Sequence, residues 1–299
     1  MKPSSSQFKE QAMRWVFTAC ACVSILAVGL ICVFLFANGL PAIAEIGPLN
    51  FLLGTTWKPG NNIYGIFPFI LGSIYVTAGA LVVGVPIGLL TAIYMSRFAD
   101  RRINRVLLPA VQLLAGIPSV VYGFFGMMVM APAVEQILKS DFAKNVLHLK
   151  GKGLSLFTAS LLLGIMILPT IITVSKASLD AVPESYYEGS LALGATHERS
   201  VFCTILPAAK SGVLSAIILG VGRAIGETMA VVMVAGNQPR MPKGLFQGLR
   251  TMTSNIVMEM GYAADLHREA LIATGVVLFV FILIINLSFS MVKRREKNA

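Results

Sequence analysis

The chain has 299 residues, of which 56% are hydrophobic and only 13% are charged, and its formal net charge is +10. Its mean hydropathy of +0.77 is not that of an ordinary soluble domain of this length, which indicates an integral membrane protein. A nucleic-acid-binding role would need a basic domain outside the membrane, and no loop between the apolar segments is large enough to form one.

Six segments are long and apolar enough to cross the membrane as helices, since about 20 residues span a hydrocarbon core of roughly 30 Å. In chain order they cover 15–37, 65–95, 106–134, 155–179, 208–235 and 267–292. We interpret the first as a retained anchor helix, because its apolar run exceeds the roughly 7–15 residues of a cleaved signal peptide. The sequence thus predicts an all-α integral membrane fold with six transmembrane helices.

Basic residues predict the orientation of these helices, because cytoplasmic loops carry an excess of Lys and Arg. An inside N-terminus places 14 basic residues in the cytoplasm and 9 on the other side, with Arg223 left in the membrane. The compact turn from Arg97 to Arg105 and the tail "KRREK" weigh most, since the rule is strongest for short loops. We therefore expect both termini in the cytoplasm, with tails at 1–14 and 293–299 flanking a membrane domain at 15–292.

Glycine and proline lie inside the predicted spans as well as between them. Gly84 and Gly88 form a small-xxx-small pair that lets another helix approach closely. Pro118 frees a backbone carbonyl that neighbours or water must satisfy. The segment around Pro118 therefore either lines a pathway or is a kink used for packing, and the sequence favours neither.

The inner segment 180–207 is predicted to form two short helices joined at a glycine. Pro183 suits a first helical turn, Gly194 a left-handed stop and Thr196 the N-cap of the second helix, while Pro207 opens the fifth span. Its apolar side chains are Tyr186, Tyr187, Leu191, Leu193 and Phe202. By physics alone, this surface either docks in a groove on a partner or packs on the chain's own inner face.

Arg223 and Glu227 stand in the apolar stretch "VGRAIGETMAV", although a charge near the bilayer centre costs roughly 2.5–3.5 kcal/mol. With 3.6 residues per turn, the two side chains lie on one helical face, and Gly222 and Gly226 thin the helix for a neighbour. The pair is either a salt bridge between helices or part of an anion path, in which arginine offers planar donors to phosphate or carboxylate. We favour the path, because intramembrane ionisable residues are functional by default.

The inner segment resembles the "EAA" loop of bacterial ABC importer permeases, the coupling element that inserts into the ATPase subunit. The resemblance lies in the spacing from Glu188 to Gly194, followed by Leu206 and Pro207. The sequence departs from the family's pattern at three positions, where alanine or an aliphatic residue is usual: Gly189, Ser190 and Thr204. The resemblance implies that Glu188, Gly194, Leu206 and Pro207 couple the permease to the ATPase.

A second resemblance indicates the transported substrate. "GVGRAIGETMAVVMVAGN" (220–237), "AGIPSVVYGFFG" (115–126) and the last span are similar to the permease subunits of high-affinity phosphate ABC importers, of PstC type rather than PstA type. The family's fold is the type I (MetI-like) permease of the bacterial cytoplasmic membrane. Its matching arginine and glutamate, at Arg223 and Glu227, are associated with phosphate movement.

The resemblance also implies partners. These are a homologous second permease (PstA type), two ATPase subunits (PstB type), an extracytoplasmic phosphate-binding protein (PstS type) and membrane lipid, with no nucleic acid. The sequence has no G-x-x-x-x-G-K-S/T loop, so ATP must be hydrolysed elsewhere and the chain is expected to be a transport subunit rather than an enzyme. We expect no cofactor and no metal, because the three histidines, His148, His197 and His267, show no ligand spacing and suit surfaces or loops.

The sequence is also compatible with other functions. The chain could be a permease for another oxyanion, such as molybdate or sulfate, or the sister phosphate permease. A self-contained anion channel or a proton-coupled carrier, with Glu227 as proton relay, is a rival of a different class. Arg240, Lys243 and Arg250 in the outer loop either receive the anion or, as we favour, are solvated loop charges.

Overall fold

The computed structural model describes residues 5–140 and 151–297, and most of them are helical. The long helices are α1 (Ser5–Ile46), α3 (Phe67–Ile93), α8 (Leu156–Asp180), α12 (Lys210–Gly226) and α15 (Asp265–Lys297). Within the described ranges five helices are long and apolar enough to cross a membrane, or six if the bent pair 197–208 and 210–226 is one span. The predicted all-α membrane fold is confirmed.

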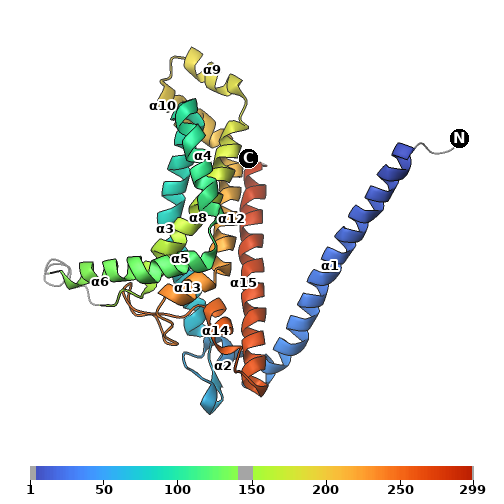
Figure 1. Cartoon of the computed structure of the whole chain (residues 1–299), viewed down its shortest axis with the longest axis vertical. Coiled ribbons are helices and arrows are strands. Elements are labelled where there is room, and N and C mark those ends of the chain that lie inside the picture. Colours follow the sequence, from blue (N-terminus) through green and yellow to red (C-terminus); the bar gives the residue numbers. More distant parts are fainter. Residues whose placement is uncertain (1–4, 141–150, 298–299) are drawn as a thin grey trace.

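Helices α3 and α8 pack side by side and form the core of the bundle, with α12 against both (Figure 1). The close approach depends on glycine: a Cβ added at Gly84 would lie 2.7 Å from the Ile167 side chain, and one at Gly88 would lie 2.8 Å from Ile171. The predicted small-xxx-small contact is therefore present, and α8 is the helix that it admits.

Helix α1 leans away from this bundle and meets α15 only near its C-terminal end (Figure 1). There Phe36 and Phe279 make an edge-to-face contact, with ring centroids 6.0 Å apart. The start of α1 and the end of α15 lie toward the end of the bundle that carries α9 (Glu184–Ala192) (Figure 1).

The opposite end is closed by short elements. After α2 (Pro48–Leu53), strands β1 (Trp57–Lys58) and β2 (Ile63–Tyr64) pair antiparallel across the 3₁₀ turn η1 (Pro59–Asn61), with Trp57 opposite Tyr64. Helix α14 (Met252–Glu259) lies beside them (Figure 1). A separate buried apolar cluster lies here around Phe51, Trp57 and Phe69, and the long helices α1, α3 and α15 contribute to it as well.

The third predicted span, 106–134, is wrong as one continuous helix. The segment consists of α4 (Arg101–Gly116), α5 (Ser119–Phe125), the π-helical η3 (Gly126–Met130) and α6 (Ala131–Lys139). Ile117 and Pro118 are extended, with ψ of 127° and 142°, because a residue before proline is pushed out of the helical region. From this break onward α5 and α6 run across the bundle rather than along it (Figure 1).

The fifth predicted span, 208–235, is also divided. It contains the end of α11 (Leu206–Ala208), α12 and α13 (Met229–Val234). Just before it lie α10 (His197–Ser200) and the π-helical η4 (Val201–Ile205). The chain bends by 70° between 197–208 and 210–226. Pro207 therefore lies inside α11, before the bend, and does not open the span as predicted. A further π-helical turn, η2 (Tyr94–Phe98), ends α3.

Candidate translocation site and coupling segment

Arg223 lies in the last turn of α12, where its side chain is half-buried. The guanidinium donates one hydrogen bond, from Nη1 to Thr170 Oγ1 on α8, at 3.3 Å. Arginine carries five N–H donors. In the part of the chain that the structure describes, no other hydrogen bond is recorded for this side chain, so most of its donors are available to another ligand.

Glu227 does not share a helical face with Arg223, so that prediction is wrong. Helix α12 ends at Gly226, and Glu227 is extended, with φ of −68° and ψ of 128°. Its carboxylate Oε1 accepts the backbone N–H groups of Thr228 and Ala230, each at 3.1 Å. The side chain thus caps the N-terminus of α13, and among the described residues no ion pair joins it to Arg223.

The two broken helices meet beside this site. A Cβ added at Gly123 on α5 would lie 3.0 Å from the Ala230 Cα on α13, so these short helices touch closely. The Tyr122 hydroxyl on α5 donates to the Leu114 carbonyl on α4 at 2.8 Å, across the helix break at Pro118. Irregular backbone at membrane depth is tolerated where protein or a water-filled cavity surrounds it. A paired break of this kind is the arrangement found at substrate sites of membrane transporters.

Gly222 and Gly226 do not admit a neighbouring helix of this chain, contrary to expectation. An added Cβ at either position would meet no described atom within 4 Å. The face of α12 next to Arg223 is thus open in the single chain.

The inner segment 180–207 folds as two short helices, as predicted. Gly194 adopts φ of +85°, the left-handed conformation that stops α9, and the Thr196 side chain caps α10 by accepting the Arg199 N–H. Pro183 is the N-cap of α9 rather than a residue of its first turn. Glu188 and Pro207 are exposed, whereas Leu206 packs partly against the bundle's end.

Some apolar side chains of this segment are exposed, as docking to a partner requires, and one packs on the chain's own inner face. Leu193 is 92% exposed and Tyr186 is 54% exposed, and Leu191 and Phe202 are also open. Tyr187 instead packs on the bundle, and its hydroxyl lies 2.7 Å from His197 Nδ1. Four of the five side chains are therefore free for a partner.

Two departures from the family's pattern contact each other. The Ser190 hydroxyl on α9 accepts hydrogen bonds from Ser200 at 3.0 Å and from Thr204 at 3.4 Å. Serine and threonine therefore replace apolar contact with a small hydroxyl cluster that ties α9 to α10 and η4. The start of α9 is tied separately, because Arg97 pairs with Glu184 at 2.9 Å and donates to the Leu179 carbonyl at 3.0 Å.

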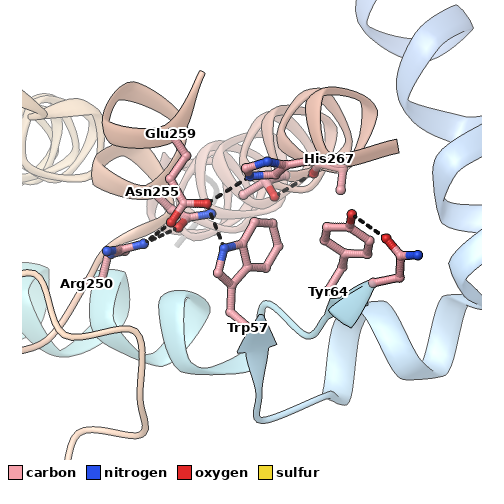
Figure 2. Close-up of polar contacts among 9 residues, drawn as sticks. Trp57, Tyr64, Arg250, Asn255, Glu259 and His267 are labelled. Atoms are coloured by element: carbon pink, nitrogen blue, oxygen red, sulfur yellow. Dashed lines mark hydrogen bonds and ion pairs between the residues drawn. The ribbon is translucent and has the colours of Figure 1, made fainter. Parts of the chain in front are cut away.

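Sequence reasoning missed a buried polar cluster at the opposite end, which Figure 2 shows. Arg250 Nη1 pairs with Glu259 Oε1 at 2.5 Å, and Glu259 Oε2 accepts from Trp57 Nε1 at 2.8 Å. His267 Nε2 lies 2.9 Å from the same Oε2, and Arg250 also donates to Asn255 at 2.9 Å. We call these five residues the Glu259 cluster.

This cluster corrects two predictions. Arg250 is not a solvated loop charge, since its side chain is 10% exposed, and His267 is not a surface histidine, since its side chain is 14% exposed. Arg240 and Lys243 are exposed as predicted, and His148 lies outside the described residues. Nearby, burial raises the pKa of the Tyr64 phenol, whose ring stacks on His267 with centroids 6.2 Å apart.

The bent and broken helices, the charged side chain at a helix end and the exposed helix pair define an integral-membrane permease. The model of the family described as "Binding-protein-dependent transport system inner membrane component" matches residues 84–298. The chain belongs to this family. It is a multi-pass inner-membrane protein of an ABC transporter, whose system includes a binding protein and an ATPase on other chains.

Several relatives carry transport names. The chain is 37% identical to "Probable ABC transporter permease protein YqgH" of Bacillus subtilis, covering 94% of this chain and 91% of the relative. It is 33% identical to "Phosphate transport system permease protein PstC" of Mesorhizobium japonicum, covering 89% and 84%. The protein of the same name from Haemophilus influenzae is 35% identical, covering 77% and 76%.

Solved structures share the fold at low sequence identity. A chain of a bacterial alginate ABC transporter superposes with a TM-score of 0.66 at 15% identity, covering 96% of this chain and 97% of that one. A chain of the MetNI methionine ABC transporter gives a TM-score of 0.56 at 19% identity, covering 78% and 94%. The MetI-like permease fold is thus confirmed.

Proposed function

We propose that this chain is the PstC-type permease subunit of an ATP-driven phosphate importer, with Arg223 on the path of the anion. The observation that carries the proposal is the half-buried Arg223 guanidinium at the end of α12, which makes one hydrogen bond, to Thr170. Arginine's planar donors suit the oxygens of phosphate. The relatives named PstC favour phosphate over molybdate or sulfate, and over the sister permease.

The proposed orientation places both termini, the tails 1–14 and 293–299, and the α9 end in the cytoplasm. The hairpin and α14 then face outward, where a PstS-type binding protein would release phosphate. The basic residue bias supports this orientation. The membrane domain at 15–292 would form the path together with a PstA-type permease, whose helices would cover the open face of α12.

Coupling to a PstB-type ATPase is assigned to residues 180–207. Glu188 and Gly194 lie on the exposed helix pair, and Leu206 and Pro207 join it to the bend before α12. Exposed Leu193 and Tyr186 supply an apolar surface for a groove on the ATPase. Movement of this helix pair would reach Arg223 through α12, because the bend at Ala209 connects them directly.

Arg223→Gln in the reconstituted four-component transporter tests the anion path. We expect phosphate uptake to be lost while the ATPase still co-purifies, because Arg223 has no ionic partner among the described residues. Arg223→Lys should also transport poorly, since lysine lacks the planar donor set. Arg240→Gln, at an exposed loop position, is the matched control.

Normal uptake by Arg223→Gln would refute the assignment. Phosphate transport by the chain alone, without the ATPase, would instead favour a channel or a proton-coupled carrier.

Gly194→Val tests the coupling assignment. Valine at φ of +85° is strained by about 1–2 kcal/mol, so we expect weaker co-purification of the ATPase and reduced uptake. Gly189→Val is the control, because an added Cβ there also meets nothing within 4 Å but the backbone is helical. Equal ATPase binding by the two variants would contradict the assignment.

A further inference from the structure

The backbone break after α12 is held by a residue that lies far along the chain. Thr253 Oγ1 donates a hydrogen bond to the Glu227 carbonyl at 3.2 Å, across 26 residues. Thr253 is 6% exposed, so water cannot readily take its place. Because a carbonyl at a helix break has no partner within the helix, this hydroxyl satisfies a group that the break itself creates.

Thr253 is in turn fixed by its own surroundings. Its hydroxyl lies 3.1 Å from that of Thr251, which caps α14 by accepting the Ser254 N–H at 3.2 Å. The Met252 N–H donates to Ser73 Oγ on α3 at 3.1 Å. The first turn of α14 is thus attached to the core of the bundle, and all of these groups are buried.

The C-terminal end of α14 is attached to the Glu259 cluster, beside the β1–β2 hairpin. Glu259, the last residue of the helix, is held by Arg250, Trp57 and His267 (Figure 2). Helix α14 therefore connects the Glu259 cluster, beside the hairpin, with the break that follows Arg223. A helix fixed at both ends transmits displacement rather than absorbing it, because its own hydrogen bonds resist shortening.

We propose that Thr253 is a positioning residue for the translocation site, through which α14 sets the place of the Glu227 backbone and hence of Arg223. The inference deepens the proposed phosphate path and rests on it. The carboxylate of Glu227 caps α13 and its carbonyl accepts from Thr253, so the break is held on both sides. Thr253 touches no substrate; it acts through the backbone that carries Arg223 and Glu227.

The test compares Thr253→Val with Thr253→Ser in the complete transporter reconstituted in vesicles. Valine keeps the shape and loses the hydroxyl, whereas serine keeps the hydroxyl and loses the methyl group. We expect Thr253→Val to lower maximal phosphate uptake about tenfold, the size of one lost buried hydrogen bond, with little change in the concentration of binding protein at half-maximal rate. Thr253→Ser should stay within about twofold of the original chain.

Thr274→Val is the matched control. Thr274 is fully buried on α15, but its hydroxyl bonds to the Ala270 carbonyl within its own helix, at 2.9 Å. The same substitution there should leave uptake nearly unchanged. Co-purification of the ATPase verifies assembly of every variant.

Two results would overturn the inference: normal uptake by Thr253→Val, or a loss in Thr253→Ser as large as in Thr253→Val, which would indicate packing alone. The proposed function fails separately. If Arg223→Gln transports normally, the phosphate path is wrong; if Arg223→Gln is inactive and Thr253→Val is normal, only the role of Thr253 is wrong.

Discussion

Arg223 and Arg250 lie in two regions that differ in how far the guanidinium is buried and how many partners it has. Arg250 is buried and paired, with Glu259 and Asn255 both accepting from it. Arg223 is half-buried and donates to one hydroxyl, that of Thr170. A buried charge is tolerated when it is paired and hydrogen-bonded, whereas donors left open are available to a ligand. The pairing of an arginine, rather than its presence, therefore decides whether its donors are used within the chain or left open to a ligand.

The largest expected effect comes from breaking the buried pair. Glu259→Ala leaves the Arg250 guanidinium buried without its carboxylate, which should destabilise the chain by about 3–5 kcal/mol. Arg223→Ala should leave stability nearly unchanged, since it breaks no ion pair among the described residues. Thermal unfolding of the purified complex in detergent measures both. Equal melting temperatures for the two variants would remove the distinction between the two arginines.

A smaller effect is expected at the break beside Arg223. Glu227→Ala removes the acceptor of the Thr228 and Ala230 N–H groups, and loss of such a cap costs about 1 kcal/mol. The melting temperature should therefore fall by less than in Glu259→Ala. Glu227→Gln keeps an oxygen acceptor and serves as the control. A fall of the same size in Glu227→Gln would indicate that the charge, rather than the cap, stabilises the break.

The effect expected from Trp57→Phe lies between those of Glu259→Ala and Glu227→Ala. Phenylalanine keeps an aromatic ring between Tyr64 and Phe69 but loses the Nε1–H donor to Glu259. Because Arg250 and His267 still contact the carboxylate, the cost should be near that of one hydrogen bond to a charged group, about 1.5–3 kcal/mol at most. Phosphate uptake should persist. A loss as large as that of Glu259→Ala would make Trp57 the main partner of the cluster.

Local signals in the sequence predicted the helix pair of the inner segment 180–207 well. Gly194 and Thr196 were identified as a stop and a cap, and the structure places them so. These predictions succeed because the conformation of a turn depends on the chemistry of a few adjacent residues. The close contact at Gly84 and Gly88 was also predictable, because the small-xxx-small spacing is a local pattern. The sequence did not indicate which helix would make that contact.

The helix breaks were only partly predictable. Pro118 signals a possible break, because proline disfavours a helical residue before it. Nothing comparable marks the end of α12 at Gly226, where glycine weakens a helix by only about 1 kcal/mol. The break there is held by contacts with Thr253 and by the capping carboxylate of Glu227. A continuous helix was therefore the natural prediction from the sequence and was wrong.

The amino-acid sequence by itself determined the membrane class, the approximate spans, the family resemblance and the two short helices of 180–207. Hydrophobic length and local caps decide these features within a few turns of chain. Only the tertiary structure decided that Glu227 caps α13 and that Glu259 joins Trp57 across 202 residues. The physical reason is that a charge is placed by the partners that satisfy it, and partners brought together by folding leave no spacing in the sequence.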